Sequence, residues 1–433
     1  MALVETAQLA RARWVPAMRG ALLTGGAQSA IQLFTFVTGL AAIRLLSIQE
    51  YAYYTIINAV LGTMSVLTDG GVAQSVMAQG GKVWNDRAAL GAVLAGGRRL
   101  RRWFALVAGV IVVPMAFVLL QKQGASAGLA LLLILSTVPL FLSSFTGQLY
   151  EVMPRLHQSL WALQRIQLAT SCVRLLAIVG TLLVLPAAWI TNLASGMAQL
   201  WSTFRIRGLA KTFADWHRPP DPAASKLMNA QVRRALPGAV YYAFSGQITS
   251  WLVSIFGTTE AVAHVGALGR LAMAFNLFTS VFTLILIPRF ARMPEHGRSR
   301  VLTRYWEVQG ALLVVLSLVV LAIALFPEPV FLILGPEYAA SAGQVTVVAA
   351  GGALSVLAGS AYGMAAARGV IVNPALAILY SLIVQTVLIA SLPLRTVSGV
   401  LWLGALGHAT LWLLYAGNFT LTRGRSATPR LAA

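Results

Sequence analysis

Long apolar runs alternate with short polar and basic breaks along nearly the whole chain. A helix needs about 20 mainly apolar residues to cross the hydrocarbon core of a bilayer, so the pattern predicts about twelve spanning helices. They are expected at 20–46, 51–79, 103–120, 125–149, 163–186, 187–207, 235–256, 260–288, 306–326, 338–366, 370–392 and 396–421. Because the runs are long and do not alternate, they are not the strands of a closed barrel.

Composition agrees with a membrane protein. Hydrophobic residues make up 58% of the chain and charged residues only 10%, whereas a soluble domain has about 25% charged residues. The net charge of +20 does not indicate nucleic acid as a partner, because the basic residues fall between the apolar runs. The sequence contains neither a phosphate-binding nucleotide loop nor a metal or hydrolase motif. We therefore expect no enzyme activity and no cofactor.

The basic residues also predict the orientation of the chain. If the N-terminus is cytoplasmic, all of them fall in cytoplasmic segments except Arg44, Lys122 and Arg395 outside and Arg174 and Arg270 within spans. Such a partition follows the positive-inside rule. It predicts that both termini are cytoplasmic and that Arg11, Arg13 and Arg19 anchor the first span. The basic cluster Arg98, Arg99, Arg101 and Arg102 is expected to contact anionic lipid headgroups.

The longest polar break, 208–234, divides the predicted spans into two equal sets. We expect an N-terminal six-helix bundle at 1–207, a cytoplasmic linker at 208–234 and a C-terminal six-helix bundle at 235–433. Residues 223–235 can form a basic amphipathic helix on the membrane surface. Because each set has an even number of spans, the two bundles have the same orientation, as in parallel-repeat transporters. The predicted fold is thus an all-α polytopic membrane protein with two bundles around a central cavity.

Three segments of the chain match short sequence motifs. Residues 44–54, RLLSIQEYAYY, are similar to the turn R-x-L-S-x-x-E-Y-G-x-Y, with Ala52 in place of the usual glycine. Residues 67–73, LTDGGVA, resemble a D-x-G element, and residues 331–338, FLILGPEY, resemble L-L-G-x-x-Y/F. With these three motifs the chain resembles the polysaccharide-export (Wzx-type) flippase family of the multidrug/oligosaccharidyl-lipid/polysaccharide exporter superfamily. The resemblance implies alternating access by two bundles and a lipid-linked sugar as substrate.

Two arginines lie about 14–15 Å deep in predicted spans, Arg174 in the fifth and Arg270 in the eighth. A charge at this depth is expensive, so both are expected to line a wet cavity or to meet negative partners. A guanidinium matches phosphate geometry, so these residues are candidates for holding a pyrophosphate or an acidic sugar. The alternative is a structural pair with carbonyls or with Asp69. Arg44, nearer the outer end, either binds substrate or extends to the interface.

Other polar residues recur on the predicted spans. Gln28 and Gln32 lie on one face of the first span, and Asn58 shares a face of the second span with Asp69. Such residues either join helices or, on the spans that the family places around its cavity, bind sugar. Asp69 is the candidate for coupling to a proton or a cation, and its alternative role is to bond at the Gly70–Gly71 break.

The sequence thus predicts a flippase that moves a polyprenyl-pyrophosphate-linked oligosaccharide across the bacterial inner membrane for the synthesis of exopolysaccharide. The alternatives are a cation-coupled multidrug exporter of the same superfamily and a peptidoglycan-precursor flippase. A cationic drug site needs acids in the lumen, where arginines are more numerous here. The expected partners are the anionic lipid-linked oligosaccharide, anionic membrane lipids and, for the pathway, a polysaccharide polymerase and glycosyltransferases.

Overall fold

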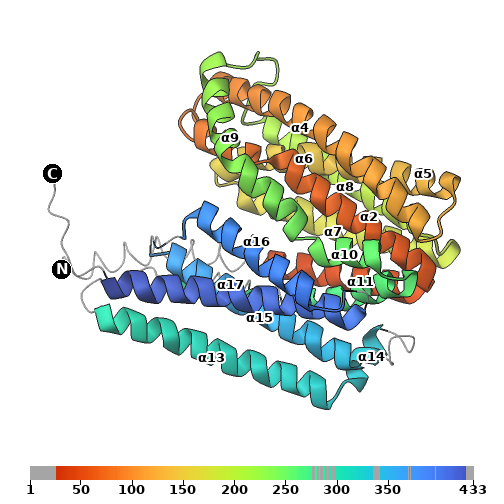
Figure 1. Ribbon diagram of the computed structural model, residues 1–433. Coiled ribbons are helices and arrows are strands. Elements are labelled where there is room, and N and C mark those ends of the chain that lie inside the picture. Colours follow the sequence, from red (N-terminus) through yellow and green to blue (C-terminus); the bar gives the residue numbers. More distant parts are fainter. Residues whose placement is uncertain are drawn as a thin grey trace, which may run out of the picture. The chain divides into compact units, whose positions relative to one another are not determined.

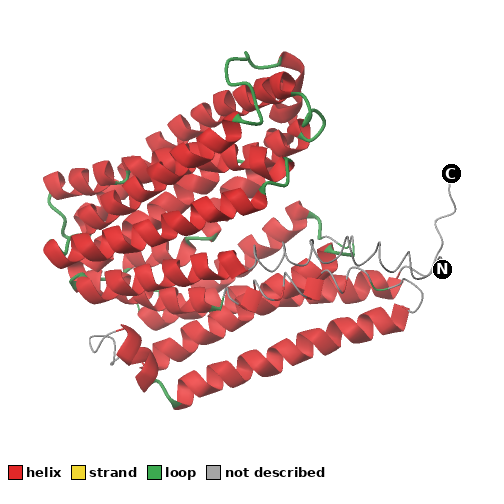
Figure 2. Cartoon of the chain, turned by 180° about the vertical axis from the view of Figure 1, so that it is seen from behind, coloured by secondary structure: helices red, strands yellow, loops and turns green. Residues whose placement is uncertain are grey.

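The described part of the chain is almost entirely helical, and no strand occurs in it (Figure 2). The computed structural model describes residues 26–275, 298–334 and 342–425, apart from 369, 371 and 395, together with a few residues between 278 and 293. Within these ranges nine helices are long and apolar enough to cross a membrane. Residues 11–19 of the predicted anchor and 335–338 of the third motif lie outside the described residues.

The contacts divide the chain into two compact units (Figure 1). Unit 1 comprises Met1–Ala42, Val60–Gln121 and Ala125–Ala243, and unit 2 comprises Ile43–Ala59, Lys122–Gly124 and Phe244–Ala433. In chain order, a first helix at Gly26–Leu45 is followed by α2 (Ile48–Asp69), α3 (Val72–Gly80), α4 (Arg87–Lys122), α5 (Ala127–Ser136), α6 (Val138–Leu156), α7 (Leu160–Val184), α8 (Ala188–Lys211) and α9 (Pro222–Ser245). The start of α2, up to Ala59, belongs to unit 2. The segment 208–234 lies within unit 1.

Unit 1 is held together by an apolar core between α3, α4, α6, α8 and α9. Its members include Val76, Leu94, Met153, Ile206 and Met228, each less than a tenth exposed. The buried residues of α9, Ala224, Met228 and Val232, recur every four residues and so form one stripe. This stripe packs onto the protein, and the amphipathic character predicted for residues 223–235 is therefore present; their position on the membrane surface stays a prediction.

The predicted break in the second span is present at two glycines. Gly70 and Gly71 have φ of 48° and 87°, a left-handed conformation that favours glycine. α2 therefore ends at Asp69, and α3 begins two residues after Gly70. The backbone N–H of Ala73 donates to Oδ1 of Asp69 at 3.2 Å, so this carboxylate caps the start of α3.

A close approach at Gly91 fixes α4 against the loop after α8. A Cβ on Gly91 would lie 1.9 Å from the carbonyl oxygen of Asp215. The backbone N–H of Asp215 donates to the carbonyl of Arg87 at 2.9 Å, and the Arg87 guanidinium donates to the carbonyl of Lys211 at 3.1 Å. The loop cannot move away from α4 without breaking these bonds.

We therefore expect Gly91→Ala to lower the free energy of unfolding by about 1–3 kcal/mol, the usual effect of overpacking. The matched control is Gly109→Ala in the same helix, where a Cβ meets nothing within 4 Å. The control should be neutral or slightly stabilising, because alanine favours a helix more than glycine does. Thermal unfolding of the purified variants in detergent tests this. Equal midpoints for both variants would contradict the packing described here.

Unit 2 is built from α10 (Ile248–Phe256), α11 (Thr259–Ala274), α13 (Arg298–Leu325), α14 (Glu328–Leu334), α15 (Ala342–Ala366), α16 (Pro374–Ser391) and α17 (Val397–Arg425). Helices α13, α15, α17 and α16 lie side by side in Figure 1. A buried glutamine links three of them, because Gln309 on α13 donates to Ser360 on α15 at 3.0 Å and accepts from the Trp412 indole on α17 at 3.0 Å. Tyr305 and Phe419 stack beside it, with ring centroids 4.4 Å apart.

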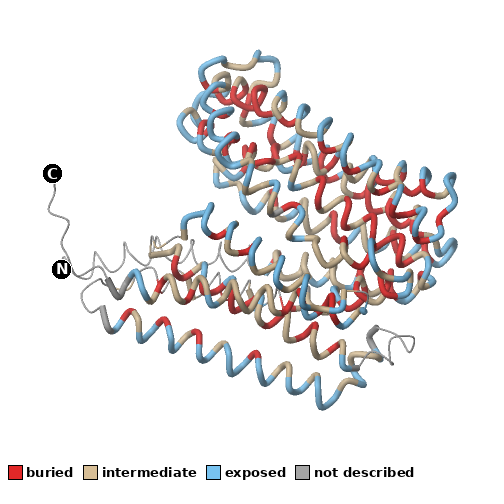
Figure 3. Tube along the Cα trace, viewed as in Figure 1, coloured by how far each residue is buried: buried red, intermediate tan, exposed pale blue. Residues whose placement is uncertain are grey.

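Many outward-facing side chains of both units are apolar. Val110 on α4 is 76% exposed, Leu176 on α7 is 70% exposed and Leu318 on α13 is 59% exposed. The outer face of α13 is exposed along much of its length in Figure 3. Exposed apolar surface of this extent is not stable in water, so these faces contact lipid. The protein is a multi-pass membrane protein.

Several predicted spans differ from the helices observed. α4 begins at Arg87 instead of 103, so the basic cluster at 98–102 is part of a continuous helix. The predicted span 125–149 is two helices, α5 and α6, which meet at Thr137, and α6 continues to Leu156. The predicted spans at 187–207, 235–256 and 260–288 correspond to α8, to α9 with α10, and to α11 with residues after it that are only partly described.

Candidate functional site

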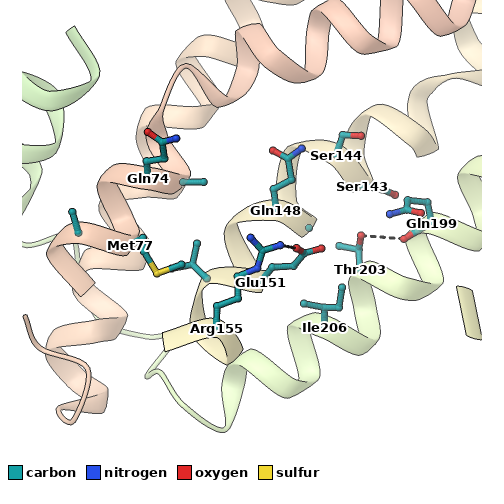
Figure 4. Close-up of a pocket in the computed structure, with 14 residues that line it drawn as sticks. Gln74, Met77, Ser143, Ser144, Gln148, Glu151, Arg155, Gln199, Thr203 and Ile206 are labelled. Carbon is teal, nitrogen blue, oxygen red and sulfur yellow. Dashed lines mark hydrogen bonds and ion pairs between the residues drawn. The ribbon is translucent and has the colours of Figure 1, made fainter. Parts of the chain in front are cut away.

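A polar cavity lies within unit 1 between α3, α6 and α8, with a volume of about 700 Å³ (Figure 4). Amide and hydroxyl side chains dominate its polar lining, and one carboxylate and one guanidinium join them. The polar lining residues are Gln74, Ser143, Ser144, Gln148, Glu151, Arg155, Gln199 and Thr203. Amides and hydroxyls both donate and accept hydrogen bonds, which suits a ligand with many hydroxyl groups.

Glu151 and Arg155 form an ion pair in the lining of this cavity, one turn apart on α6 (Figure 4). The Glu151 carboxylate is 16% exposed, and its other oxygen accepts from the Gln167 amide of α7 at 3.1 Å. The sequence analysis missed this acid because it placed the end of the span at 149. Since α6 continues past that point, Asp69 is not the only acid in the candidate spans of unit 1.

Asp69 pairs with Arg101, and both are held by further bonds. The distance from Asp69 Oδ1 to the Arg101 guanidinium is 3.0 Å, and the Arg101 side chain is only 1% exposed. The same guanidinium donates to the carbonyl of Phe145 at 2.9 Å and to Oε1 of Gln148 at 2.8 Å, so it reaches the cavity lining. Arg101 was predicted to be one of four surface arginines that contact lipid headgroups. It is buried instead, because it faces the acid of α2.

The polar faces of the first helix and α7 meet within unit 1. The Arg174 guanidinium donates to Oγ1 of Thr35 at 2.7 Å, and the Gln164 amide reaches Oε1 of Gln28 at 3.5 Å. Arg174 lies near the middle of α7 and is half-buried, as is Gln32 on the first helix. None of these residues is in the lining of the unit 1 cavity.

The other predicted site residues belong to unit 2. The Arg270 guanidinium on α11 lies over the ring of Tyr54, 5.6 Å from its centroid, which is a cation–π contact. Asn58 donates from its side-chain amide to the carbonyl of Tyr54 at 2.7 Å, one turn earlier on α2. Arg44 is exposed in the last turn of the first helix. Arg270, Tyr54 and Asn58 therefore lie together, and Arg174 lies in the other unit.

Unit 2 contains a cavity of its own, of about 330 Å³. Small and apolar residues form most of its lining, and its polar members are Thr249, Ser250, Ser355 and His408. His408 lies on α17, inside a predicted span, and the sequence analysis did not single it out. The sequence could have indicated His408 as a cavity residue, because the small residues Gly404 and Ala405 lie one turn before it on the helix and leave room for a cavity. In the described part of the chain no cluster of His, Cys, Asp and Glu could hold a metal ion.

Polar cavities thus lie behind the lipid-facing helices of each unit. No protein-family profile and no curated protein matches the chain. Among solved structures, it is similar to an inward-facing multidrug resistance MATE family transporter of the MOP superfamily, with 14% identity, a TM-score of 0.67 and coverage of 92% of this chain and 96% of that one. The chain therefore shares the fold of MOP superfamily transporters.

Two further structures have the same fold. A MATE transporter from Vibrio cholerae has 14% identity and a TM-score of 0.57, over 94% of this chain and 97% of that one. A MOP superfamily transporter from Pyrococcus furiosus, described as having a binding pocket of reverse polarity, has 12% identity and a TM-score of 0.58, over 94% of this chain and 95% of that one. At these identities the likeness concerns the fold.

Proposed function

We propose that the protein is a flippase that moves a polyprenyl-pyrophosphate-linked oligosaccharide across the bacterial inner membrane by alternating access. Both termini are then cytoplasmic, and the substrate enters from the cytoplasmic leaflet. The resemblance of residues 44–54 and 67–73 to polysaccharide-export flippases supports this substrate class. The fold shared with MOP superfamily transporters supports the transport mechanism.

The observation that carries the proposal is the charge balance in unit 1. Among its described residues only two acids lie in candidate spans, Asp69 and Glu151, and each forms an ion pair with an arginine. Their negative charge is thus already neutralised, so it does not create a site for a cationic drug. Arg174 adds a positive charge near the middle of α7. A substrate with a negatively charged head group matches this balance.

Each part of the substrate has residues that suit it. The amides and hydroxyls of the unit 1 cavity suit sugar hydroxyls, since each can donate and accept. Arg174, Arg270 and Arg44 are each proposed as a contact of the pyrophosphate or of an acidic sugar, because a guanidinium can bind two phosphate oxygens at once. Gln28, Gln32 and Asn58 are proposed to contact the sugar.

Asp69 is the candidate for ion coupling. Its pairing with Arg101 means that a coupling cation has to compete with a guanidinium 3.0 Å away.

The second candidate function is a cation-coupled multidrug exporter, and the multidrug MATE transporters with this fold support it. However, the transporter of reverse pocket polarity shares the fold as well. Fold similarity therefore does not distinguish the two functions. The charge of the bound substrate does, because it is negative for the flippase and positive for the drug exporter.

Binding to the purified protein tests the proposal. We expect a polyprenyl-pyrophosphate-linked oligosaccharide to raise the thermal unfolding midpoint, because a ligand stabilises the state to which it binds. A cationic drug and the same lipid without sugar and phosphate serve as controls and should have little effect. Stabilisation by the cationic drug alone would contradict the flippase and favour the exporter.

A further inference from the structure

A small pocket on unit 1 gathers four arginines with no acid in its lining. It is formed by Arg98, Arg101 and Arg102 of α4, Arg207 of α8 and apolar residues of α6 that include Phe145 and Leu149, and its volume is about 240 Å³. We call this site the arginine pocket. It is distinct from the 700 Å³ cavity and shares no lining residue with it.

Three of the four guanidiniums of the arginine pocket are held in place before any ligand arrives. Those of Arg98 and Arg207 both lie over the Trp216 ring, 5.0 Å and 5.3 Å from its centroid. The ring itself packs edge-on against Tyr150, with centroids 4.8 Å apart. Arg101 is fixed by the carbonyl of Phe145 and by Asp69. Pre-positioned donors lose little conformational freedom on binding, which favours a tight and specific contact.

The negative charge near this pocket is too small to balance the positive charge of its four arginines. Asp69 pairs with Arg101 alone, and Asp215, next to Trp216 in the sequence, pairs with Arg218 at 3.2 Å. The Nε of Arg101 is buried and has no hydrogen-bond partner among the described residues. Clustered positive charges repel one another at short range, and a bound anion relieves that repulsion and supplies acceptors.

The pocket lies where the lipid-facing surface of unit 1 ends. On α4 the exposed apolar residues begin directly after the arginines, with Trp103 at 65% and Leu106 at 63% exposed. On α8 they end at Phe204, which is 62% exposed and precedes Arg207 by three residues. Tryptophan at such a boundary marks the level of the lipid headgroups. The anion presented to the pocket is therefore one carried at the membrane surface.

We infer that the arginine pocket binds a phosphate group presented at the headgroup level of the membrane. Arginine forks match phosphate oxygens in geometry and charge, and the apolar floor from α6 suits the adjoining part of a lipid. Two sources carry this chemistry at that level, an anionic phospholipid and the pyrophosphate of a lipid-linked substrate. The inference does not depend on the proposed function, because either source satisfies it.

A matched pair of double variants tests the inference. Arg102→Gln with Arg207→Gln removes two charges from the pocket, and Arg99→Gln with Arg205→Gln removes two charges from exposed neighbours on the same helices that do not line it. The protein is placed in nanodiscs of phosphatidylcholine, with or without phosphatidylglycerol, and thermal stability and retained lipid are measured. Inorganic pyrophosphate and polyprenyl pyrophosphate are titrated separately into the phosphatidylcholine discs.

We expect the pocket variant to bind at least one of these probes about tenfold or more weakly than wild type, and the control variant to bind it like wild type. A response to phosphatidylglycerol identifies the phospholipid as the source, and a response confined to the two pyrophosphates identifies the substrate head group. If the pocket variant fails to fold, Arg102→Gln alone serves, because this side chain is exposed. Equal weakening in both double variants, or no response of wild type to any probe, would overturn the inference.

Discussion

Arg174→Ala and Arg270→Ala are each expected to abolish export of the lipid-linked oligosaccharide in a complementation assay, while the protein still inserts and accumulates normally. Each substitution removes a fork of donors from an apolar helix, where a charged side chain is costly and by default marks a functional site. Lysine at either position should restore transport only in part, because a point charge replaces a bidentate contact. The control is Arg165→Ala, which changes an exposed arginine of the same helix as Arg174.

A purely structural role for Arg174 makes a different prediction. If the residue only joins α7 to the first helix through Thr35, Thr35→Val should reproduce the loss of transport. We expect Thr35→Val to retain most of the activity, because it removes one hydrogen bond and leaves the charge in place. Full complementation by both arginine-to-alanine variants would show that these arginines do not bind substrate.

Asp69→Asn is expected to destabilise unit 1 by about 3 kcal/mol, near the lower end of the range for breaking a buried ion pair. The reason is that Arg101, only 1% exposed, would keep its charge and lose its one acidic partner. The double variant Asp69→Asn with Arg101→Gln removes both charges and should be more stable than Asp69→Asn alone. Denaturation of the purified variants measures both effects, and a single variant as stable as wild type would contradict the pair.

Transport by the folded fraction of Asp69→Asn, which keeps Arg101, separates two roles of Asp69. If this acid couples transport to an ion, the folded protein should fail to transport substrate against a gradient. If it only caps α3 and pairs with Arg101, transport should continue at the wild-type rate. Either result is informative, because folding and transport are measured on one protein.

Much of the fold could be predicted from the sequence because apolar runs of spanning length have few alternatives in a bilayer. The break at Gly70–Gly71 was predicted for a similar reason, since paired glycines in a span loosen the helix, and both adopt positive φ. The sequence predicted the end of α6 less accurately. Glu151 and Arg155 form their ion pair one turn apart, so the helix continues past the point where hydropathy alone ends it.

Arg101 shows what the sequence analysis missed within the site and why. Taken as one of four adjacent arginines, it indicated a surface cluster. However, Leu90, Leu94, Gly97, Arg101, Ala108 and Val112 are all buried. Their spacings of three, four and seven residues follow one face of a helix. A helical register carried through the basic cluster would have placed Arg101 on the buried face, but its partner Asp69, on another helix, depends on tertiary packing.

The central claim is that the protein moves an anionic lipid-linked sugar from one leaflet to the other. Its most direct test is a translocation assay in proteoliposomes that carry polyprenyl-pyrophosphate-linked oligosaccharide, with an impermeant glycosidase or lectin detecting the sugar on the outer face. We predict that the fraction exposed rises with time beyond half in vesicles with wild-type protein under an ion gradient. Vesicles with Arg174→Ala should stay at the level of protein-free vesicles. An unchanged distribution with folded wild-type protein, together with gradient-driven uptake of a cationic drug, would contradict the account.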